Sequence, residues 1–445
     1  MADRQDTERV IRRTRTICTV CKDMVEAVVL SCAGKVFLER KCPVHGQERS
    51  LLCGDADYYA AVDDLYFNVL TGRRSIKSYL LYLTGKCDLD CPICYLSDRS
   101  AKEDMSLREI EDILRRMRGA QCIVYAAEPT CREDLPEVIR LIRRYQGTVK
   151  LFTNGVRLAD KAYLRVLRDA GLGQVVLQFD GFKRETYVAL RGEDLLDAKL
   201  RTLDNLRETG TSTFLSCVLA KGLNEDEVES MIRYAAGQDF IECVAFTALT
   251  VVGGAETRLK NLVLLPDESI DRLCHHSQGK IDRAYFRLCQ KILHISTALN
   301  YERVCFYTQM IILFRTKDGY VTLSELVDTA CLERLLDRYA VWVKEKVWAA
   351  RLRLACGVLA LFAFNRGYRK LLAAMLRTLL ARRFKTSMSP QALRPFVVSF
   401  YRGCDHGNND DLVMRTCMWR LVFKEKGTVS TDKTMTECLG LADRH

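Results

Sequence analysis

Proline, tryptophan and histidine are scarce in this chain of 445 residues, which contains seven, three and six of them. With so few prolines, long helices can form along most of the chain. Long apolar runs are scarce as well. In the C-terminal half the longest uncharged run covers residues 354–365, fewer than the about 20 residues that a membrane-spanning helix needs. We therefore expect no transmembrane helix.

Two further absences narrow the class of protein. The N-terminal residues mix acids with bases and contain no apolar stretch typical of a signal peptide, so we expect a cytoplasmic protein. No segment repeats at a fixed period, which argues against a solenoid or a propeller. The composition, with 48% hydrophobic and 28% charged residues, is that of a globular chain long enough for more than one domain.

Cysteine, in contrast, is abundant, with 20 copies. In the reducing interior of a cell, thiols bind metals or take part in catalysis more often than they form disulfides. The sequence therefore predicts metal sites.

The middle of the chain alternates buried strands with amphipathic helices. Six apolar runs have the length and composition of buried strands, at residues 79–84, 122–127, 149–153, 175–179, 213–219 and 242–249. Helical patterns fill the intervals, at residues 106–118, 134–146, 158–170, 194–210 and 225–236. This alternation predicts a parallel α/β sheet, open or partly closed into a barrel.

The most specific motif directly follows the first of these strands. Cys87, Cys91 and Cys94 form a C-x3-C-x2-C pattern within one short loop. Three thiolates at this spacing can hold three irons of a four-iron cluster and leave the fourth iron open to an exogenous ligand. A zinc site is the alternative interpretation of the same three cysteines.

This loop, placed after the first strand, resembles the cluster site of the radical S-adenosylmethionine (SAM) superfamily. The resemblance implies an α/β fold, a partial (β/α)6 TIM-type barrel, with SAM bound to a 4Fe-4S cluster. It also implies that one electron from the cluster cleaves SAM to a 5′-deoxyadenosyl radical. Cys87, Cys91 and Cys94 would then be the catalytic residues that hold the cluster.

Further positions resemble the superfamily, in order along the chain. Where the superfamily usually has Gly-Gly-Glu-Pro, this sequence has Ala126, Ala127 and Glu128 before a proline, so both glycines are alanine. All of the matching positions follow strands, at the edge where barrel active sites are built. The resemblance implies a SAM-binding role for Ala126, Ala127, Glu128, Asn154, Gln178, Asp180 and Arg191.

The N-terminal segment contains a second metal motif. Cys18 and Cys21 form a C-x2-C pair, and Cys42 and His45 form a matching pair after a hairpin pattern. Two such knuckles offer the four nitrogen and sulfur donors that a tetrahedral site needs, as in a zinc ribbon or a rubredoxin. The sequence thus predicts one bound iron or zinc ion, with Cys53 as the alternative fourth ligand if the site is all-thiolate.

The C-terminal cysteines resemble a narrower branch of the superfamily, which comprises the tetraether lipid synthases and the class D radical SAM methylases. Members of this branch share the N-terminal metal motif. The sequence around Cys438 departs from the branch pattern, as does the long spacing between Cys289 and Cys305. The resemblance implies an auxiliary 4Fe-4S cluster bound by some of Cys289, Cys305, Cys417 and Cys438.

Positive charge is concentrated toward the C-terminus. The net charge is +11, and residues 344–385 hold eleven lysines and arginines against one acid, Glu345. Apolar residues recur at helical spacing from Tyr368 to Leu380. Residues 341–385 could therefore lie on an anionic membrane surface, or pack on the protein's own core with their arginines in solvent. No nucleic acid is expected as a partner, because stacking aromatics are not interleaved with the cations.

We expect three parts: a metal-ribbon domain at residues 1–65, a radical SAM core at 75–258, and a mostly helical extension at 259–445 with the auxiliary cluster. The branch resemblance implies hydrogen abstraction from an unactivated carbon and formation of a carbon–carbon bond. The substrate would be a lipid chain or a soluble heterocycle such as a pterin, and the electron would come from a reductant such as ferredoxin or flavodoxin. A non-catalytic iron–sulfur scaffold is the alternative from another class.

Overall fold

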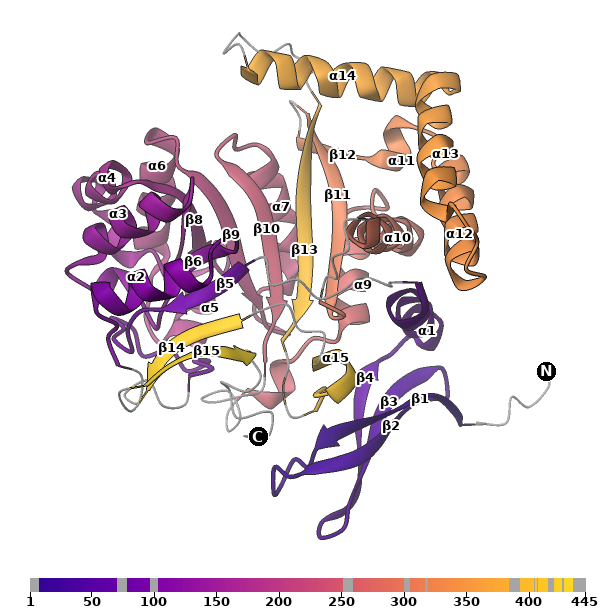
Figure 1. Ribbon diagram of the computed structural model, residues 1–445, viewed down its shortest axis with the longest axis horizontal. Helices are drawn as coiled ribbons and strands as arrows, with labels where there is room; N and C mark the ends of the chain where they lie inside the picture. Colours follow the sequence, from indigo (N-terminus) through magenta and orange to yellow (C-terminus); the bar gives the residue numbers. More distant parts are fainter. Residues whose placement is uncertain are drawn as a thin grey trace.

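Two sheets organise the protein, a small antiparallel sheet at the N-terminus and a large, mostly parallel sheet (Figure 1). The computed structural model describes residues 8–69, 78–96, 103–250, 259–299, 305–316, 319–383, 393–403, 405, 407–414, 420–425 and 428–434.

The small sheet is a meander of four strands, as the hairpin pattern predicts. Its strands are β1 (Arg9–Ile17), β2 (Met24–Cys32), β3 (Lys35–Cys42) and β4 (Gly46–Cys53). Ala33 and Gly34 join β2 to β3, and both take positive φ angles, as a tight two-residue hairpin requires. Along β3 every second side chain is buried, so one face of the sheet packs on the rest of the protein.

The large sheet contains all six strands that the apolar runs predict. They are β5 (Ser78–Tyr82), β6 (Gln121–Tyr125), β7 (Val149–Thr153), β8 (Leu172–Gln178), β9 (Ser212–Leu219) and β10 (Ile241–Ala248). Each pairs in parallel with the next strand of the sequence. The carboxyl ends of all six therefore lie along one edge of the sheet, called here the C-terminal edge.

Amphipathic helices connect these strands and gather on one side of the sheet (Figure 1). They are α2 (Leu107–Arg116), α3 (Leu135–Tyr145), α4 (Lys161–Ala170), α5 (Arg184–Arg191), α6 (Leu196–Glu208) and α7 (Val228–Ala236). Helix α2 shows why they form where they do. Ser106 and Glu109 make a reciprocal capping box at its start, and Ile110 and Ile113 are buried on its inner face.

The C-terminal part is helical, as expected, and it also extends the sheet. Its longer helices are α9 (Pro266–His276), α10 (Arg283–Leu299), α12 (Ala330–Lys344), α13 (Ala350–Phe364) and α14 (Arg366–Arg383). Its strands are β11 (Thr308–Thr316), β12 (Gly319–Thr322), β13 (Arg394–Arg402), β14 (Arg420–Glu425) and β15 (Thr428–Thr434). Its short helices are α11 (Leu323–Leu326) and α15 (Asp411–Met414). A further short helix, α1 (Ala56–Asp64), follows β4 near the N-terminus.

Two of the late strands are parallel to the barrel-type strands, which the sequence analysis did not anticipate. Strand β13 pairs with β10, and β14 pairs with β5 at the other end of the parallel series. Strand β13 is buried deeply, with Phe396, Val398 and Phe400 in the main core. Its second residue is Pro395 and its sequence surroundings are rich in turn residues, so its apolar run is recognisable as a strand only once its partner β10 is known.

The N-terminal sheet is fixed to the segment that follows β13. The Arg12 guanidinium pairs with Asp63 at 2.7 Å and with the buried carboxylate of Asp410. The Thr14 hydroxyl donates to Asp410 at 2.7 Å, and Arg40 donates to the carbonyl of Gly407 at 3.1 Å. Because these residues follow the carboxyl end of β13, the small sheet lies toward the C-terminal edge (Figure 1). The domain boundaries stay a prediction.

Among the residues that the structure describes, no helix combines the length and the apolar character that crossing a membrane requires.

Candidate active site and metal centre

The C-terminal edge brings the predicted cluster loop next to the segment that follows β6. The loop is residues 85–96, and it begins just beyond β5. The amide of Ala127 donates to the carbonyl of Thr84 at 3.1 Å, and the amide of Glu128 donates to that of Lys86 at 2.9 Å. Ala126 beside them is buried. Backbone hydrogen bonds thus tie the Ala-Ala-Glu segment directly to the start of the loop.

The cluster loop holds its three cysteines half-buried and close to the protein core. Leu89 packs against buried residues of α5 and the start of α6, and Ile93 packs in a second small core. The amide of Leu89 donates to the Cys87 sulfur at 3.4 Å. Leu89 and Ile93, which lie between the cysteines, therefore fix the loop to the core, while the three thiols stay partly exposed.

The donor set of this loop fits a cluster with three thiolate ligands, since Cys87, Cys91 and Cys94 lie on one short segment. Burial raises the pKa of Cys87 to about 12 and raises that of Cys91. Without bound iron these groups are therefore neutral thiols at pH 7. Iron would displace the protons and hold the thiolates, as metals do with coordinated cysteine.

Arg191 lies beside Cys91 and is held there by Asp180. Its Nε and its second terminal nitrogen contact the two carboxylate oxygens of Asp180 at 2.7 Å and 3.0 Å. Asp180 is fully buried, and it also accepts from the amide of Val218 at 3.0 Å and from the side chain of Gln178. Burial alone lowers the pKa of Arg191, but the Asp180 carboxylate outweighs it and raises that pKa above its ordinary value. The site thus keeps one fixed positive charge next to the cluster loop.

Glu128 joins the ends of β6 and β7. One carboxylate oxygen accepts from the Thr130 amide at 3.0 Å, the Thr130 hydroxyl at 2.6 Å and the Thr153 hydroxyl at 2.7 Å. The other accepts from the Asn154 amide at 2.6 Å. Burial raises the pKa of Glu128, and the four donors oppose this effect. In this arrangement Glu128 orients the neighbouring segments of the site.

Asn154 contacts the cluster loop directly. Its side-chain nitrogen Nδ2 donates to the Asp88 carboxylate at 2.6 Å, and its side-chain oxygen Oδ1 accepts from the backbone amide of Val156 at 2.9 Å. Gly155 follows with a φ of +78°, which closes the turn after β7. The Thr-Asn-Gly turn therefore positions one polar side chain over the loop that carries the cysteines.

Lys199 completes the polar network, and the sequence analysis missed it. The side chain is fully buried on α6, and its amine donates to the carbonyl of Gln178 at 3.0 Å and to its side chain at 2.6 Å. It also donates to the carbonyl of Asn154. A signal was present: Lys199 falls on the same helical stripe as Leu196 and Leu203, where an apolar residue is expected.

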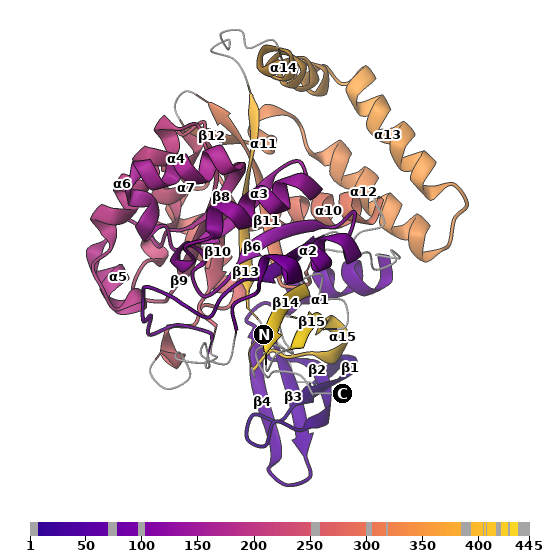
Figure 2. The ribbon, with the colours of Figure 1, turned by 60° about the vertical axis from the view of Figure 1, so that its left-hand side comes forward.

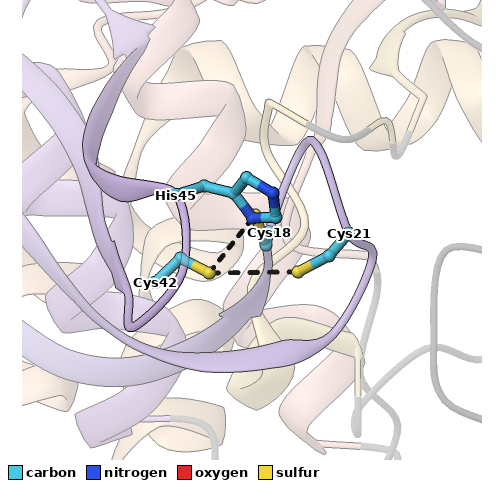
Figure 3. Close-up of side chains that lie close together, drawn as sticks. All are labelled: Cys18, Cys21, Cys42 and His45. Carbon is cyan, nitrogen blue, oxygen red and sulfur yellow. Dashed lines mark hydrogen bonds between the residues drawn. The ribbon is translucent and has the colours of Figure 1, made fainter.

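The second predicted site is assembled in the N-terminal sheet. The donor atoms of Cys18, Cys21, Cys42 and His45 all lie within 4.8 Å of one another (Figure 3). The Cys42 sulfur is 3.5 Å from Nδ1 of His45 and 3.9 Å from the Cys21 sulfur. A tetrahedral zinc ion with bonds of about 2.3 Å places two sulfurs about 3.8 Å apart. The four residues therefore fit one tetrahedral metal ion.

The turns on either side of this group explain its geometry. Cys18 and Cys21 lie in the turn between β1 and β2, Cys42 is the last residue of β3, and His45 lies in the turn before β4. Backbone amides of His45 and Val44 lower the pKa of Cys42 to about 6, which favours the thiolate that a metal needs.

Cys53, the alternative fourth ligand, lies outside the group that Cys18, Cys21, Cys42 and His45 form. Its sulfur is buried and donates to the carbonyl of Asp55 at 3.4 Å, and Asp267 also lies beside it. The structure thus places a ring nitrogen of His45, and not the Cys53 sulfur, beside the three thiols.

The predicted auxiliary cluster stays a prediction. Cys289 is buried in the main core on α10, next to Tyr285. Cys305 precedes β11 and packs at the margin of a separate core beneath the N-terminal sheet. Cys417 and Cys438 lie outside the described residues.

Comparisons with known proteins agree with this geometry. Residues 81–235 match the family described as the radical SAM superfamily, and residues 10–54 match the HMPTM N-terminal zinc ribbon domain. The chain is 31% identical over 289 residues to the 7,8-dihydro-6-hydroxymethylpterin dimethyltransferase of Methanocaldococcus jannaschii, covering 58% of this chain and 57% of that protein. It is also 31% identical over 166 residues to the probable GTP 3′,8-cyclase of Pyrococcus abyssi, covering 36% and 54%.

Among solved structures, Streptococcus suis SuiB bound to the precursor peptide SuiA is similar with a TM-score of 0.40 and 18% identity, covering 50% of this chain and 49% of that one. The chain spans little more than half the length of the curated relatives named above.

The parallel sheet, its cluster loop and the family match define a radical SAM domain. Residues 81–235 are therefore a radical SAM domain, and a zinc ribbon at residues 10–54 precedes it. Membership in the narrower branch with the tetraether lipid synthases stays a prediction.

Proposed function

We propose that this protein is a radical SAM methylase that acts on a small heterocyclic substrate of the pterin type. It abstracts a hydrogen atom from an unactivated carbon of that substrate, and a methyl group then leaves a second donor molecule and joins that carbon, with a further electron supplied by the reductant. The observation that carries the proposal is the position of Arg191, held by Asp180 beside Cys91 at the C-terminal edge. The similarity to the pterin dimethyltransferase and to the HMPTM zinc ribbon supports the substrate class.

The residues of the site have distinct roles in this proposal. When bound at Cys87, Cys91 and Cys94, a four-iron cluster would supply the electron that cleaves SAM. Arg191 offers a fixed positive charge to the SAM carboxylate, and Asp180 prevents the guanidinium from turning away.

Further residues support the cluster loop or would line the SAM pocket. Asn154 fixes the cluster loop through Asp88, and Glu128 holds Asn154. Ala126 and Ala127 would line the approach of the SAM amine, with less room than two glycines leave.

A lipid chain as substrate has less support. That possibility depends on the basic segment at residues 341–385, which includes α13 and α14. Helix α14 leads into the start of β13, and β13 is parallel to β10, so α14 lies at the edge of the sheet opposite to the cluster loop (Figure 1). Nothing in this arrangement delivers an acyl chain from that helix to the site. A soluble substrate and a soluble reductant of the ferredoxin or flavodoxin type suit the C-terminal edge better.

The proposal is tested with the full-length protein, purified anaerobically and loaded with iron and sulfide. The protein is reduced with dithionite in the presence of SAM and 7,8-dihydro-6-hydroxymethylpterin deuterated at its ring carbons. We expect 5′-deoxyadenosine to form and to carry deuterium taken from the pterin, as measured by mass spectrometry. Cys91→Ala is the control.

Two results would contradict parts of the proposal separately. If the loaded protein forms no more 5′-deoxyadenosine than Cys91→Ala, the chain is not a SAM-cleaving enzyme and the scaffold alternative holds. If 5′-deoxyadenosine forms without deuterium from the labelled pterin, while deuterated GTP or a deuterated lipid extract labels it, the pterin-type substrate is wrong.

A further inference from the structure

Helix α13 presents an apolar face to solvent. Its sequence, ARLRLACGVLALFAF, has two arginines near its start and no other charge. Leu354 packs into the main core, whereas exposed residues recur at helical spacing on the opposite face. These exposed residues are Leu352, Ala355, Cys356, Leu359, Ala360 and Ala363. A helix that is apolar all round is normally covered on every side. The exposed face of α13 is therefore a candidate binding surface.

Large side chains make the surface strongly apolar. Leu352 and Leu359 are 62% and 68% exposed, and they lie seven residues apart on the same face. Trp348 just before the helix is 79% exposed, and Phe364 at its end is 85% exposed. Figures 1 and 2 both show α13 on the outside of the molecule. An aromatic side chain at each end of an apolar helix is typical of helices at a membrane interface.

The neighbouring helix α14 packs by the first part of the apolar stripe that the sequence predicts and exposes its cations, whereas Leu372 and Leu376 of the same stripe are exposed. Tyr368 and Leu371 are buried in the main core, which agrees with core packing for this part of the stripe. Five cations on α13 and α14 are exposed, and none of them pairs with a carboxylate among the described side chains. They are Arg353, Arg366, Arg369, Lys370 and Arg377.

We infer that α13 and α14 together dock on an anionic phospholipid membrane. The apolar face of α13 would enter the boundary between headgroups and acyl chains, and the five cations would contact anionic headgroups. With 15 residues, α13 is about 22 Å long, shorter than the ~30 Å hydrocarbon core, so it would lie in the plane of the interface. The charge of one sign beside the apolar face favours lipid over a protein partner of ordinary, mixed surface charge.

The geometry also fixes the orientation of the docked protein. Helix α14 lies at the edge where β13 begins, α13 packs against α12 and α14 on the outside of the molecule, and the cluster loop lies at the C-terminal edge (Figure 1). The radical SAM site would therefore open away from the membrane toward water. This inference does not depend on the proposed function, because no residue of the docking surface belongs to the site.

The test is flotation of the full-length protein with vesicles of phosphatidylcholine alone or of phosphatidylcholine with phosphatidylglycerol. We expect the wild type to float with the anionic vesicles only. Leu352→Glu with Leu359→Glu should reduce the bound fraction about tenfold, because two charges would enter the apolar layer. The matched control is Leu107→Glu with Val166→Glu, at two exposed apolar positions on α2 and α4.

A second pair of variants tests the electrostatic part. Arg366→Gln, Arg369→Gln and Lys370→Gln together should abolish the preference for anionic vesicles. Arg108→Gln, Arg144→Gln and Arg165→Gln change the net charge equally, on the helices of the barrel, and should leave the preference intact. Unchanged iron content and circular dichroism establish that each variant is folded.

Three outcomes would overturn the inference. The wild type could stay at the bottom of the gradient with both kinds of vesicle. The α13 variants could float as well as the matched controls. The wild type could instead sediment as a dimer without lipid, with the α13 variants monomeric, in which case the face joins two copies of this chain.

Discussion

Single residues set the electrostatics of the radical SAM site, and Lys199 is the most informative of them. Burial lowers its pKa to about 7, whereas an unfolded chain keeps the ordinary value near 10.5. Between these two pH values the unfolded chain binds more protons than the folded one, so this residue makes the protein more stable as the pH rises. Below pH 7 the same burial is a cost, because the folded protein must hold a charged amine.

We therefore predict that the stability of the wild type rises with pH relative to that of Lys199→Met. The gain should reach at most about 1.4 kcal/mol per pH unit between pH 7 and pH 10. Urea unfolding of both proteins at pH 7, 8 and 9 measures the difference, in which the shared titration of the thiols cancels. Lys35→Met, at an exposed lysine, is the control and should follow the wild type. Equal slopes for wild type and Lys199→Met would contradict a buried, titrating amine.

His45 and Cys53 give a second prediction at this scale. Replacing His45 with alanine removes one of four donors and should release the ribbon metal ion, whereas Cys53→Ser should retain it. Metal analysis of the purified, full-length proteins, with zinc and iron counted separately, measures the loss. Loss of the ion from Cys53→Ser with retention in His45→Ala would show that the fourth ligand is wrongly assigned.

The sequence identified most site residues through their fixed spacing. The four predicted ribbon ligands form two short motifs, which the hairpins of the small sheet bring within 4.8 Å of one another, and the three loop cysteines share one short segment. The pairing of Arg191 with Asp180 could not be predicted. Both residues were recognised, but their contact depends on how α5 packs under the end of β8. Lys199 was missed because a single lysine in a helix is ordinarily exposed.

Whole elements were predictable where their pattern is local. Strands β5 to β10 are continuous apolar runs with helices between them, so burial on both faces is visible in the sequence. Strands β13 and β14 pair with elements that are far away in the sequence. The covered face of helix α13 could not be predicted either. Its apolar residues occur on all sides of the helix, so the sequence does not show which face is covered.

The turn after β7 yields a prediction about an element junction. A Cβ atom on Gly155 would lie 2.2 Å from Cδ1 of Leu177, in addition to the strain of its φ of +78°. Gly222 has a similar φ of +76° with nothing within 4 Å of such an atom. We expect Gly155→Ala to lower the free energy of unfolding by about 1–3 kcal/mol more than Gly222→Ala does. Urea unfolding measures both, and equal effects would mean that the backbone moves to relieve the contact.

At the scale of the whole molecule, Arg12 links the zinc ribbon to the rest of the chain. Its guanidinium pairs with Asp63 and with Asp410, whose carboxylate is fully buried, and Asp410 also accepts from Thr14. Removing the cation would leave two carboxylates close together without the positive charge that neutralises them. Such a change typically costs about 3–5 kcal/mol, whereas breaking an exposed pair costs about 0–1 kcal/mol.

We therefore predict that Arg12→Met loosens the ribbon, while Arg184→Met, which breaks exposed pairs with Asp194 and Asp197, has little effect. Amide hydrogen exchange of the full-length protein should show faster exchange in Arg12→Met at residues 8–17 and 407–414, on both sides of the contact. The six parallel strands should keep their protection, because their hydrogen bonds and core do not involve the ribbon. Faster exchange throughout the sheet would instead mean that the ribbon and the radical SAM domain unfold as one cooperative unit.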